Sequence, residues 1–247
     1  MDDQKSTVRA VERALDILLC FTDTKELGLT EIASRISLHK STVHRLLATL
    51  ESRGFVLRDA DTDKYRLGFR LWELSANLGH SDDLATVLLP EMERLRDLLE
   101  ETISLYVRDG KERIRIQAVQ SNQPVRRVAP IGARMPLAVG ASSKVLVAYT
   151  DHSFLQELLN DPSWPETVDR DVFLEQLEQI RQHGYATSVE EREIGAAAIA
   201  APIFNRSGKL VAALAVSGPS NRLTEEQMQK FAEPIMEAAK RMGKMVK

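Results

Sequence analysis

The spacing of the apolar residues changes along this chain and divides it into two kinds of structure. Up to residue 101 these residues recur mostly at helical intervals, as in Val43, Leu46, Leu47 and Leu50. Beyond it, stretches that begin at Ile103 alternate apolar and polar residues with the period of a strand. A length of 247 residues is enough for one large or two ordinary domains. We therefore expect a mostly helical first part and a second part that mixes strands with helices.

The first 67 residues have the order of a winged helix-turn-helix. Helical spacing covers residues 8–21, a short helix follows Thr30 as its N-cap, and a third helix comes after a tight turn at Ser37 and Leu38. Gly54 ends this third helix at a position that favours glycine. Two β-prone runs around a polar tip, over residues 55–67, then predict a hairpin. In such a motif the second helix of the helix-turn-helix enters the major groove of DNA.

The solvent face of the third predicted helix has a composition that suits DNA. It carries small, hydroxyl and cationic side chains, and no acid stands between Leu38 and Leu50. Arg45 can contact guanine with two hydrogen bonds, and acidic residues would repel the phosphates. The candidate DNA-contacting residues are Thr30, His39, Lys40, Ser41, Thr42, His44, Arg45, Thr49, Arg58 and Lys64. The alternatives are a helix whose small face packs on another helix and a merely solvated charged face. The hairpin tip argues for caution, because its three aspartates are poor partners for phosphate.

The second part reads as an α+β domain in which helices cover an antiparallel sheet. The expected helices cover residues 69–78, 84–101 with a break or kink at Pro90, 142–149, 153–159 and 172–183, and Thr224 caps a last helix. The expected strands cover residues 103–107, 114–118, 124–137, 197–204 and 210–217. Residues 80–83 are polar and suit a boundary between the two parts.

Several stretches of the chain resemble the isocitrate lyase regulator (IclR) family of bacterial transcription factors. They are VRAVERALDILLCF, LTEIASRISLHKSTVHRLLATLESRGFV, YRLGFRLWELSANLG, GARMPLAVGASSKVLVAY, EREIGAAAIAAPIF and LVAALAVSGPSNRLTEE. Together they cover nearly the whole chain in the order of the family. The resemblance implies a winged helix-turn-helix domain over residues 1–67, a linker helix and joint over 68–83, and a GAF-like antiparallel-sheet domain that binds an effector over 84–247. The chain departs from the family at Ser37, His39, Ser143 and Ala198, where relatives often carry Gly, Pro, Gly and Cys.

The resemblance also implies a small-molecule pocket between the sheet and the loops that cover it. Carried over by position, the pocket involves Ala141, Ser142, Ser188, Glu190 or Glu191, Ala196, Ala198, Ala215 and Ser217. The backbone N–H groups near Ser142 would suit a carboxylate, and Ser217 would add a hydroxyl. Each alanine taken singly is also explained by ordinary core packing, and the acids by a solvated loop. We expect an organic acid as the effector.

The expected partners are double-stranded operator DNA and a second copy of the chain, as a homodimer or a dimer of dimers. Apolar residues over 8–21 and 71–78 offer a surface for the dimer. The family contains both repressors and activators, and repression of a catabolic operon is the preferred reading. The effector is expected to act on DNA binding through residues 69–83.

The sequence gives little sign of enzymatic chemistry. It has no nucleophile elbow and no Walker A motif, and its histidines lack metal-ligand spacing with Cys20. Adjacent Ser143 and Lys144 on a helix point about 100° apart and make a poor nucleophile pair. We therefore expect no catalytic residue, metal or cofactor. A small-molecule hydrolase or transferase that uses the C-terminal pocket is the alternative, and an interaction module without DNA binding is a third possibility.

The cellular compartment follows from composition. A single cysteine allows no disulfide within the chain, and Cys20 lies in an apolar run that suits a protein core. The polar N-terminus does not resemble a signal peptide, and no apolar run is long enough to span a membrane. We expect a cytoplasmic protein without a membrane partner.

Overall fold

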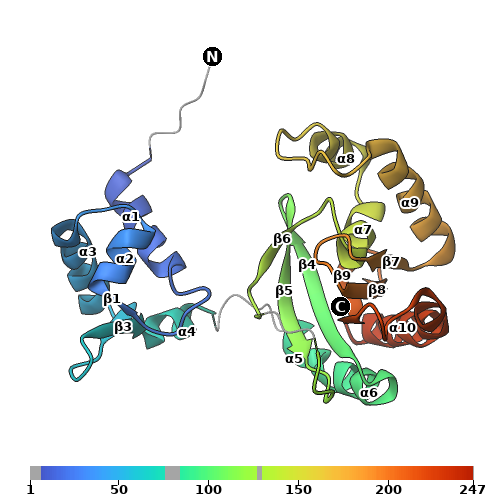
Figure 1. The fold of residues 1–247 in the computed structure, drawn as a ribbon, viewed down its shortest axis with the longest axis horizontal. Helices are drawn as coiled ribbons and strands as arrows, with labels where there is room; N and C mark the ends of the chain where they lie inside the picture. The colour runs from blue at the N-terminus through green and yellow to red at the C-terminus, as the bar shows by residue number, and fades with distance from the viewer. Residues whose placement is uncertain (1–6, 76–83, 127–129, 247) are drawn as a thin grey trace. The chain divides into compact units, whose positions relative to one another are not determined.

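The computed structural model describes residues 7–75, 84–126 and 130–246 (Figure 1). The chain divides into two compact units, Met1–Ser81 and Asp82–Lys247. The end of the expected linker helix and the joint at 80–83 lie outside the described residues. The predicted domain boundaries remain predictions.

The first unit is a small helical domain with a three-stranded antiparallel sheet. Its elements are α1 (Arg9–Leu19), β1 (Leu27–Gly28), α2 (Leu29–Arg35), α3 (Lys40–Ser52), β2 (Val56–Arg58), β3 (Lys64–Leu67) and α4 (Phe69–Ser75). The sheet order is β1-β3-β2, so β3 lies between the predicted hairpin partner β2 and the short strand β1, which the sequence analysis did not predict. Apolar residues from α1, α2, α3 and the sheet, with Cys20 beside them, form one core. The predicted winged helix-turn-helix order is confirmed.

The start of α2 corrects the prediction that Thr30 caps this helix. The helix begins at Leu29, and the N-cap position belongs to Gly28. The Gly28 N–H donates to the Glu31 carboxylate over 2.7 Å, which is the bond that the glutamate of a capping box makes to the N-cap residue. In the turn before α3, Ser37 has φ +52°, the left-handed conformation that glycine adopts more easily.

The second unit is built on a six-stranded sheet with the order β6-β5-β4-β9-β8-β7, in which every neighbouring pair is antiparallel. The strands are β4 (Thr102–Asp109), β5 (Glu112–Val119), β6 (Arg134–Pro136), β7 (Ala186–Val189), β8 (Ala196–Phe204) and β9 (Leu210–Pro219). The helices are α5 (Leu84–Val87), α6 (Leu89–Leu99), α7 (Ala141–Ala148), α8 (His152–Leu159), α9 (Arg170–His183) and α10 (Glu225–Met245). The predicted α+β class is confirmed.

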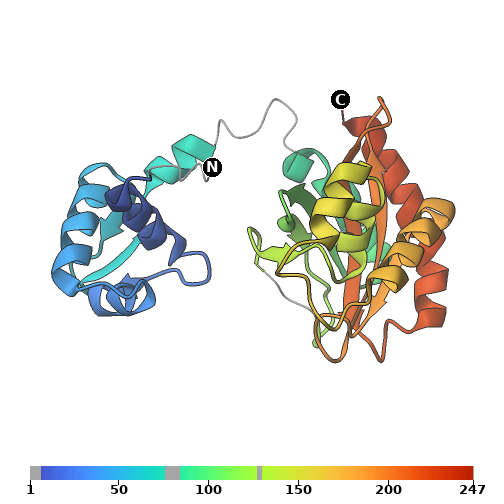
Figure 2. The same ribbon diagram turned by 90° about the horizontal axis from the view of Figure 1, so that it is seen from above.

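Helices cover both faces of this sheet (Figure 1 and Figure 2). On one face α6 and α10 pack against the larger side chains of the central strands, such as Ile199 and Leu214. On the other face α7, α8 and α9 pack against alanines such as Ala200 and Ala215. Because side chains alternate along a strand, each central strand contributes to both cores.

Two expectations about individual elements had different outcomes. The break at Pro90 is confirmed: α5 ends before it, and Pro90 lies in the first turn of α6, where a missing N–H costs no helical bond. The strand expected over 124–137 is confirmed only near its end, since among the described residues the strand covers Arg134–Pro136, which pair with β5. Pro130 lacks an N–H donor and Gly132 has φ +85°, which favours a loop before this strand.

The close approach of α10 to the end of β8 depends on a glycine. A Cβ added at Gly243 would lie 2.0 Å from the carbonyl oxygen of Phe204. We expect Gly243→Ala to lower the free energy of unfolding by about 1–3 kcal/mol, because helix and strand must move apart. Exposed Gln229→Ala in the same helix should change it by less than about 0.5 kcal/mol. Urea unfolding of both variants measures this, and equal midpoints would contradict the packing argument.

Candidate functional site

Helix α3 turns one face to the core and the other to solvent. Val43, Leu47 and Leu50 are buried. The exposed face carries several of the predicted DNA-contacting residues, namely Lys40, Ser41, His44, Arg45 and Thr49. Thr42 is half-buried, and exposed His39 occupies the N-cap position without a side-chain cap bond. Exposed Thr30 lies on a different helix, in the first turn of α2.

A shallow groove between α1 and α3 adds a residue that the sequence analysis missed. The groove has a volume of about 240 Å³, and its lining includes Arg13 from α1 together with Thr42, Arg45 and Thr49 from α3. Arg13 belongs to the helical run over residues 8–21. The pattern of that run did not indicate that Arg13 would lie beside α3. The contact follows from the packing of α1 on α3, which are distant in sequence.

The wing is the β2–β3 hairpin, and one of its cations forms an ion pair with one of its own acids. Arg58 bonds the Asp63 carboxylate over 2.8 Å, so this predicted phosphate contact has an internal partner, whereas Lys64 is exposed. The backbone N–H and the hydroxyl of Thr62 hold the pKa of the Asp59 carboxyl below its ordinary value. The aspartates at the tip are therefore used in local turn structure and ion pairing.

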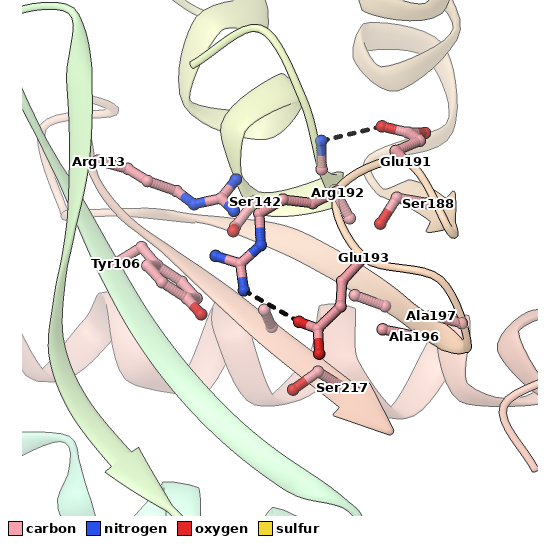
Figure 3. A pocket seen from close by; sticks show the side chains of 14 residues that line it. Tyr106, Arg113, Ser142, Ser188, Glu191, Arg192, Glu193, Ala196, Ala197 and Ser217 are labelled. Carbon is pink, nitrogen blue, oxygen red and sulfur yellow. Dashed lines mark hydrogen bonds and ion pairs between the residues drawn. The ribbon is translucent and has the colours of Figure 1, made fainter. Parts of the chain in front are cut away.

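In the second unit, a small cavity lies between the start of α7, the sheet and the loop that follows β7 (Figure 3). Its volume is about 50 Å³. The structure brings together around it the predicted residues Ala141, Ser142, Ser188, Glu191, Ala196, Ala198, Ala215 and Ser217. Glu190 does not line it: this carboxylate accepts hydrogen bonds from the Gly195 N–H and the Ser220 hydroxyl, both at 3.0 Å. Of the two expected glutamates, Glu191 is the one at the cavity.

Cross-strand register explains why these distant residues meet. Ser188 on β7 is opposite Ala198 on β8, and Ala198 is opposite Ser217 on β9. The three side chains therefore form one row across the sheet, and their small size leaves room above it. Ser217 is 6% exposed, and in the described part of the chain its hydroxyl has no hydrogen-bond partner. A buried hydroxyl in this condition suits a bound molecule.

The sequence analysis missed several residues that line the cavity. They are Tyr106, Arg113, Gly140, Arg192, Glu193 and Ala197. Gly140 carried a local signal, because it precedes the helix and has φ +93°, which L residues rarely adopt. Arg113 is buried on β5 and donates to the Val139 carbonyl over 3.0 Å and to the Ser143 hydroxyl. Arg113 reaches the cavity because of the way β5 pairs in the sheet. The sequence predicts this strand only as part of a hairpin.

Glu191, which lines the cavity, forms an ion pair with Lys144, which does not line it. Lys144 is 3% exposed, and its ammonium lies 2.6 Å from the Glu191 carboxylate. The other oxygen of this carboxylate accepts the Gly140 N–H over 2.9 Å, just before the start of α7. The sequence analysis considered a nucleophile pair here, but the ammonium is directed at Glu191. In Figure 3, Arg192 and Glu193 point into the same cavity, and their side chains form an ion pair of 3.6 Å.

Comparison with known proteins settles the family. The model of the IclR helix-turn-helix domain matches residues 10–60, and that of the bacterial transcriptional regulator IclR C-terminal domain matches residues 77–243. The chain belongs to the IclR family. It is therefore a DNA-binding transcriptional regulator with a C-terminal effector domain.

Relatives in the IclR family match over nearly the full length. The HTH-type transcriptional regulator KdgR of Escherichia coli is 32% identical over 98% of this chain and 94% of its own length. The transcriptional repressor AllR of the same organism is 32% identical over 94% of this chain and 88% of its own length. An IclR homologue from Microbacterium hydrocarbonoxydans, solved in complex with 4-hydroxybenzoate, aligns with a TM-score of 0.82 and 26% identity, covering 96% of this chain and 98% of its own.

Among the described residues of this IclR-family chain, no helix is long and apolar enough to span a bilayer. The same residues contain no cluster of three or more His, Cys, Asp or Glu side chains placed to hold a metal ion.

Proposed function

We propose that this IclR-family chain represses a catabolic operon, that α3 reads the operator, and that the cavity beside α7 binds a small organic acid. The observation that carries the proposal is that one chain joins an exposed helix face without acids to a cavity at the start of α7, in which the buried Ser217 hydroxyl has no hydrogen-bond partner among the described residues. The first arrangement suits a polyanion and the second suits a small carboxylate. The repressor AllR and the 4-hydroxybenzoate complex support each half of this proposal by analogy.

The DNA contacts of the proposal divide into two kinds. Arg45, in the exposed face of α3, is proposed to read a base, because a guanidinium can bond the O6 and N7 atoms of guanine together. The other candidate residues, on α3 and at its N-cap, in the first turn of α2 and in the β2–β3 hairpin, are proposed to bind phosphates, which fixes the register without reading sequence. They are Thr30, His39, Lys40, Ser41, Thr42, His44, Thr49, Arg58 and Lys64.

A dimer is proposed from the exposed apolar side chains of the first unit. On α1, Val8, Val11, Leu15 and Leu19 are spaced along one face, and each is more than half exposed. On α4, Phe69 and Trp72 are both 73% exposed. Continuous exposed apolar surface of this kind is uncommon on a monomer and marks an association site. A symmetric homodimer, alone or as a dimer of dimers, would cover it.

The effector is proposed to change operator affinity through the segment that joins the two units. A ligand alters DNA binding only by the difference in its affinity for two arrangements of the protein, which typically amounts to about 1–3 kcal/mol. The organic acid would place its carboxylate near the N-terminus of α7, with the rest of the molecule against Ser217 and the alanines of β8 and β9.

Replacing the base-reading arginine tests the DNA contact. Arg45→Ala should cost about 1–3 kcal/mol at the operator and relax preference at one base position. Arg53→Ala, which removes an equally exposed cation just after α3, serves as the control and should weaken all sequences alike. Fluorescence anisotropy on operator and scrambled duplexes at fixed salt measures both. Unchanged operator affinity in the first variant would remove Arg45 from this role.

Charging the exposed apolar surface tests the dimer. Trp72→Glu should shift the protein toward monomer and weaken operator binding, while Leu98→Glu, at an exposed position of α6 in the second unit, should leave the association state unchanged. Sedimentation gives the mass, and footprinting should show half-sites about 10 bp apart or a multiple of that. A wild-type monomer that protects one isolated half-site would refute the proposal.

Filling the cavity tests the sensor. Ser142→Trp should abolish the response to the effector and leave operator binding intact, because a bulky ring occupies the proposed site. Ala198→Leu is a milder variant that fills the cavity less. Ser153→Trp, at an exposed position of α8, is the control. A thermal-shift screen of small carbon-source acids, followed by operator titration with each hit, measures the response. Hits that stabilise wild type and both filled variants equally would place the ligand elsewhere.

A further inference from the structure

We propose that a second ligand site lies between α7, α9 and β7, and that it binds a small molecule whose oxyanion group contacts the ammonium of Lys144. The cavity at this place, which we call the edge pocket, has a volume of about 270 Å³. Its polar lining residues come from the three elements and from the turn before β7, and they are Lys144, Gln176, Gln179, His183, Tyr185 and Thr187. The described residues that line it are all different from those that line the cavity at Ser217.

Lys144 brings a buried charge to the wall of the edge pocket. The residue is 3% exposed, whereas most lysines reach water. Its ammonium has three N–H donors, and among the described residues it gives one hydrogen bond, to the Glu191 carboxylate over 2.6 Å. A buried donor without an acceptor is unfavourable, so the other N–H groups favour an acceptor in the pocket that Lys144 lines.

The rest of the lining supplies further hydrogen-bond donors. The side-chain amides of Gln176 and Gln179 and the imidazole of His183 can each donate. No aspartate or glutamate belongs to the described residues that line the pocket. Donors from several elements around a cation suit the oxygens of a carboxylate or a phosphate, because hydrogen bonds to an ionised group are the stronger ones.

The size and position of the edge pocket suit a small metabolite. Its volume of about 270 Å³ exceeds the roughly 150 Å³ that accommodates a benzene ring. Strand β7 is at the edge of the sheet, and α7 and α9 lie beside it (Figure 1). The lining runs from exposed Gln179 and His183 to buried Lys144, so a ligand that enters from solvent meets the ammonium at the inner end.

The Lys144–Glu191 ion pair connects the edge pocket to the cavity at Ser217. Lys144 lines the first and Glu191 lines the second. An oxyanion on Lys144 would share the ammonium with Glu191 and weaken its attraction for that carboxylate, without entering the other cavity. Occupation of the edge pocket would therefore alter the loop after β7, which forms part of the wall of the effector cavity. This consequence, unlike the site itself, rests on the proposed function.

Phosphate and acetate test the site without knowledge of the ligand. One of them should raise the melting temperature of the full chain more than chloride does at equal ionic strength, and the more effective anion indicates whether the ligand is a phosphate or a carboxylate. Gln176→Trp fills the edge pocket, and it should raise the half-maximal concentration of that anion about tenfold or more, because charged hydrogen bonds to Lys144 are lost. Gln182→Trp, at an exposed position of α9 that does not line the pocket, is the matched control and should respond like wild type.

Removing the ammonium assigns the response to Lys144. Lys144→Met should lose the selective anion response, as Gln176→Trp does. Anion binding by the cations of α3 is common to all these variants and does not affect the comparison. Equal half-maximal concentrations in wild type and Gln176→Trp, or no advantage of either anion over chloride in wild type, would overturn the inference. If Lys144→Met does not fold, Gln176→Trp and its control decide the outcome.

Ser142→Trp separates the two sites. It fills the cavity at Ser217 and should keep the wild-type anion response, whereas loss of that response would place the anion in that cavity and overturn the inference. Acids that shift operator affinity, without selective anion binding at the edge pocket, would leave the sensor intact and refute the second site. Selective anion binding there, with no acid of the screen affecting operator affinity, would support the second site and refute the sensor.

Titration of the strongest acid from the screen, with and without the more effective anion, tests the connection between the sites. The anion should change the dissociation constant of the acid in wild type and leave it unchanged in Gln176→Trp. Equal dissociation constants in wild type would refute the connection through Lys144 and Glu191.

Discussion

The pairing of β8 with β9 is the constraint on which the second unit depends. Along these strands, Ile199 and Leu214 lie on the face that packs against α6 and α10, whereas Ala198 and Ala215 lie on the opposite face. The large residues supply the apolar core that holds the long C-terminal helix. The small ones allow the beginning of α7 to approach the sheet and leave a cavity between them. A one-residue slip in register would exchange the two faces and remove both the core and the site.

Much of the architecture could be predicted, because local periodicity and tertiary burial agree in most elements. The apolar stripe of Val43, Leu47 and Leu50 is the buried face of α3 in the structure. Prediction failed where turn chemistry or the pairing of distant strands determines where an element begins and ends. Thr30 was the predicted N-cap residue of α2, but Gly28 occupies that position and donates its N–H to the Glu31 carboxylate. Residues 124–137 contain apolar residues, yet only their last part finds a strand partner, and that partner is β5.

The candidate site was predictable in its outline but not in its electrostatics. Resemblance to the IclR family supplied positions that the register of β7, β8 and β9 brings together, with Ser217 among them. Periodicity could not reveal that Lys144 points to Glu191, because that contact joins a helix to a loop far along the chain. It could not place Arg113 at the cavity either, because sequence patterns predict that an arginine on a strand is exposed, whereas this one is buried. Only tertiary packing determines where such residues lie.

In the proposed function, one chain links an acid-binding cavity to a DNA-reading helix. Linkage is reciprocal, so a ligand that changes operator affinity by some factor must have its own affinity changed by operator DNA by the same factor, typically about 5–150-fold. Calorimetric titration of the strongest acid from the screen into the protein, with and without saturating operator, tests this most directly. The account predicts that the two dissociation constants differ by the factor seen in the DNA titration. Equal dissociation constants for the acid with and without operator would contradict it.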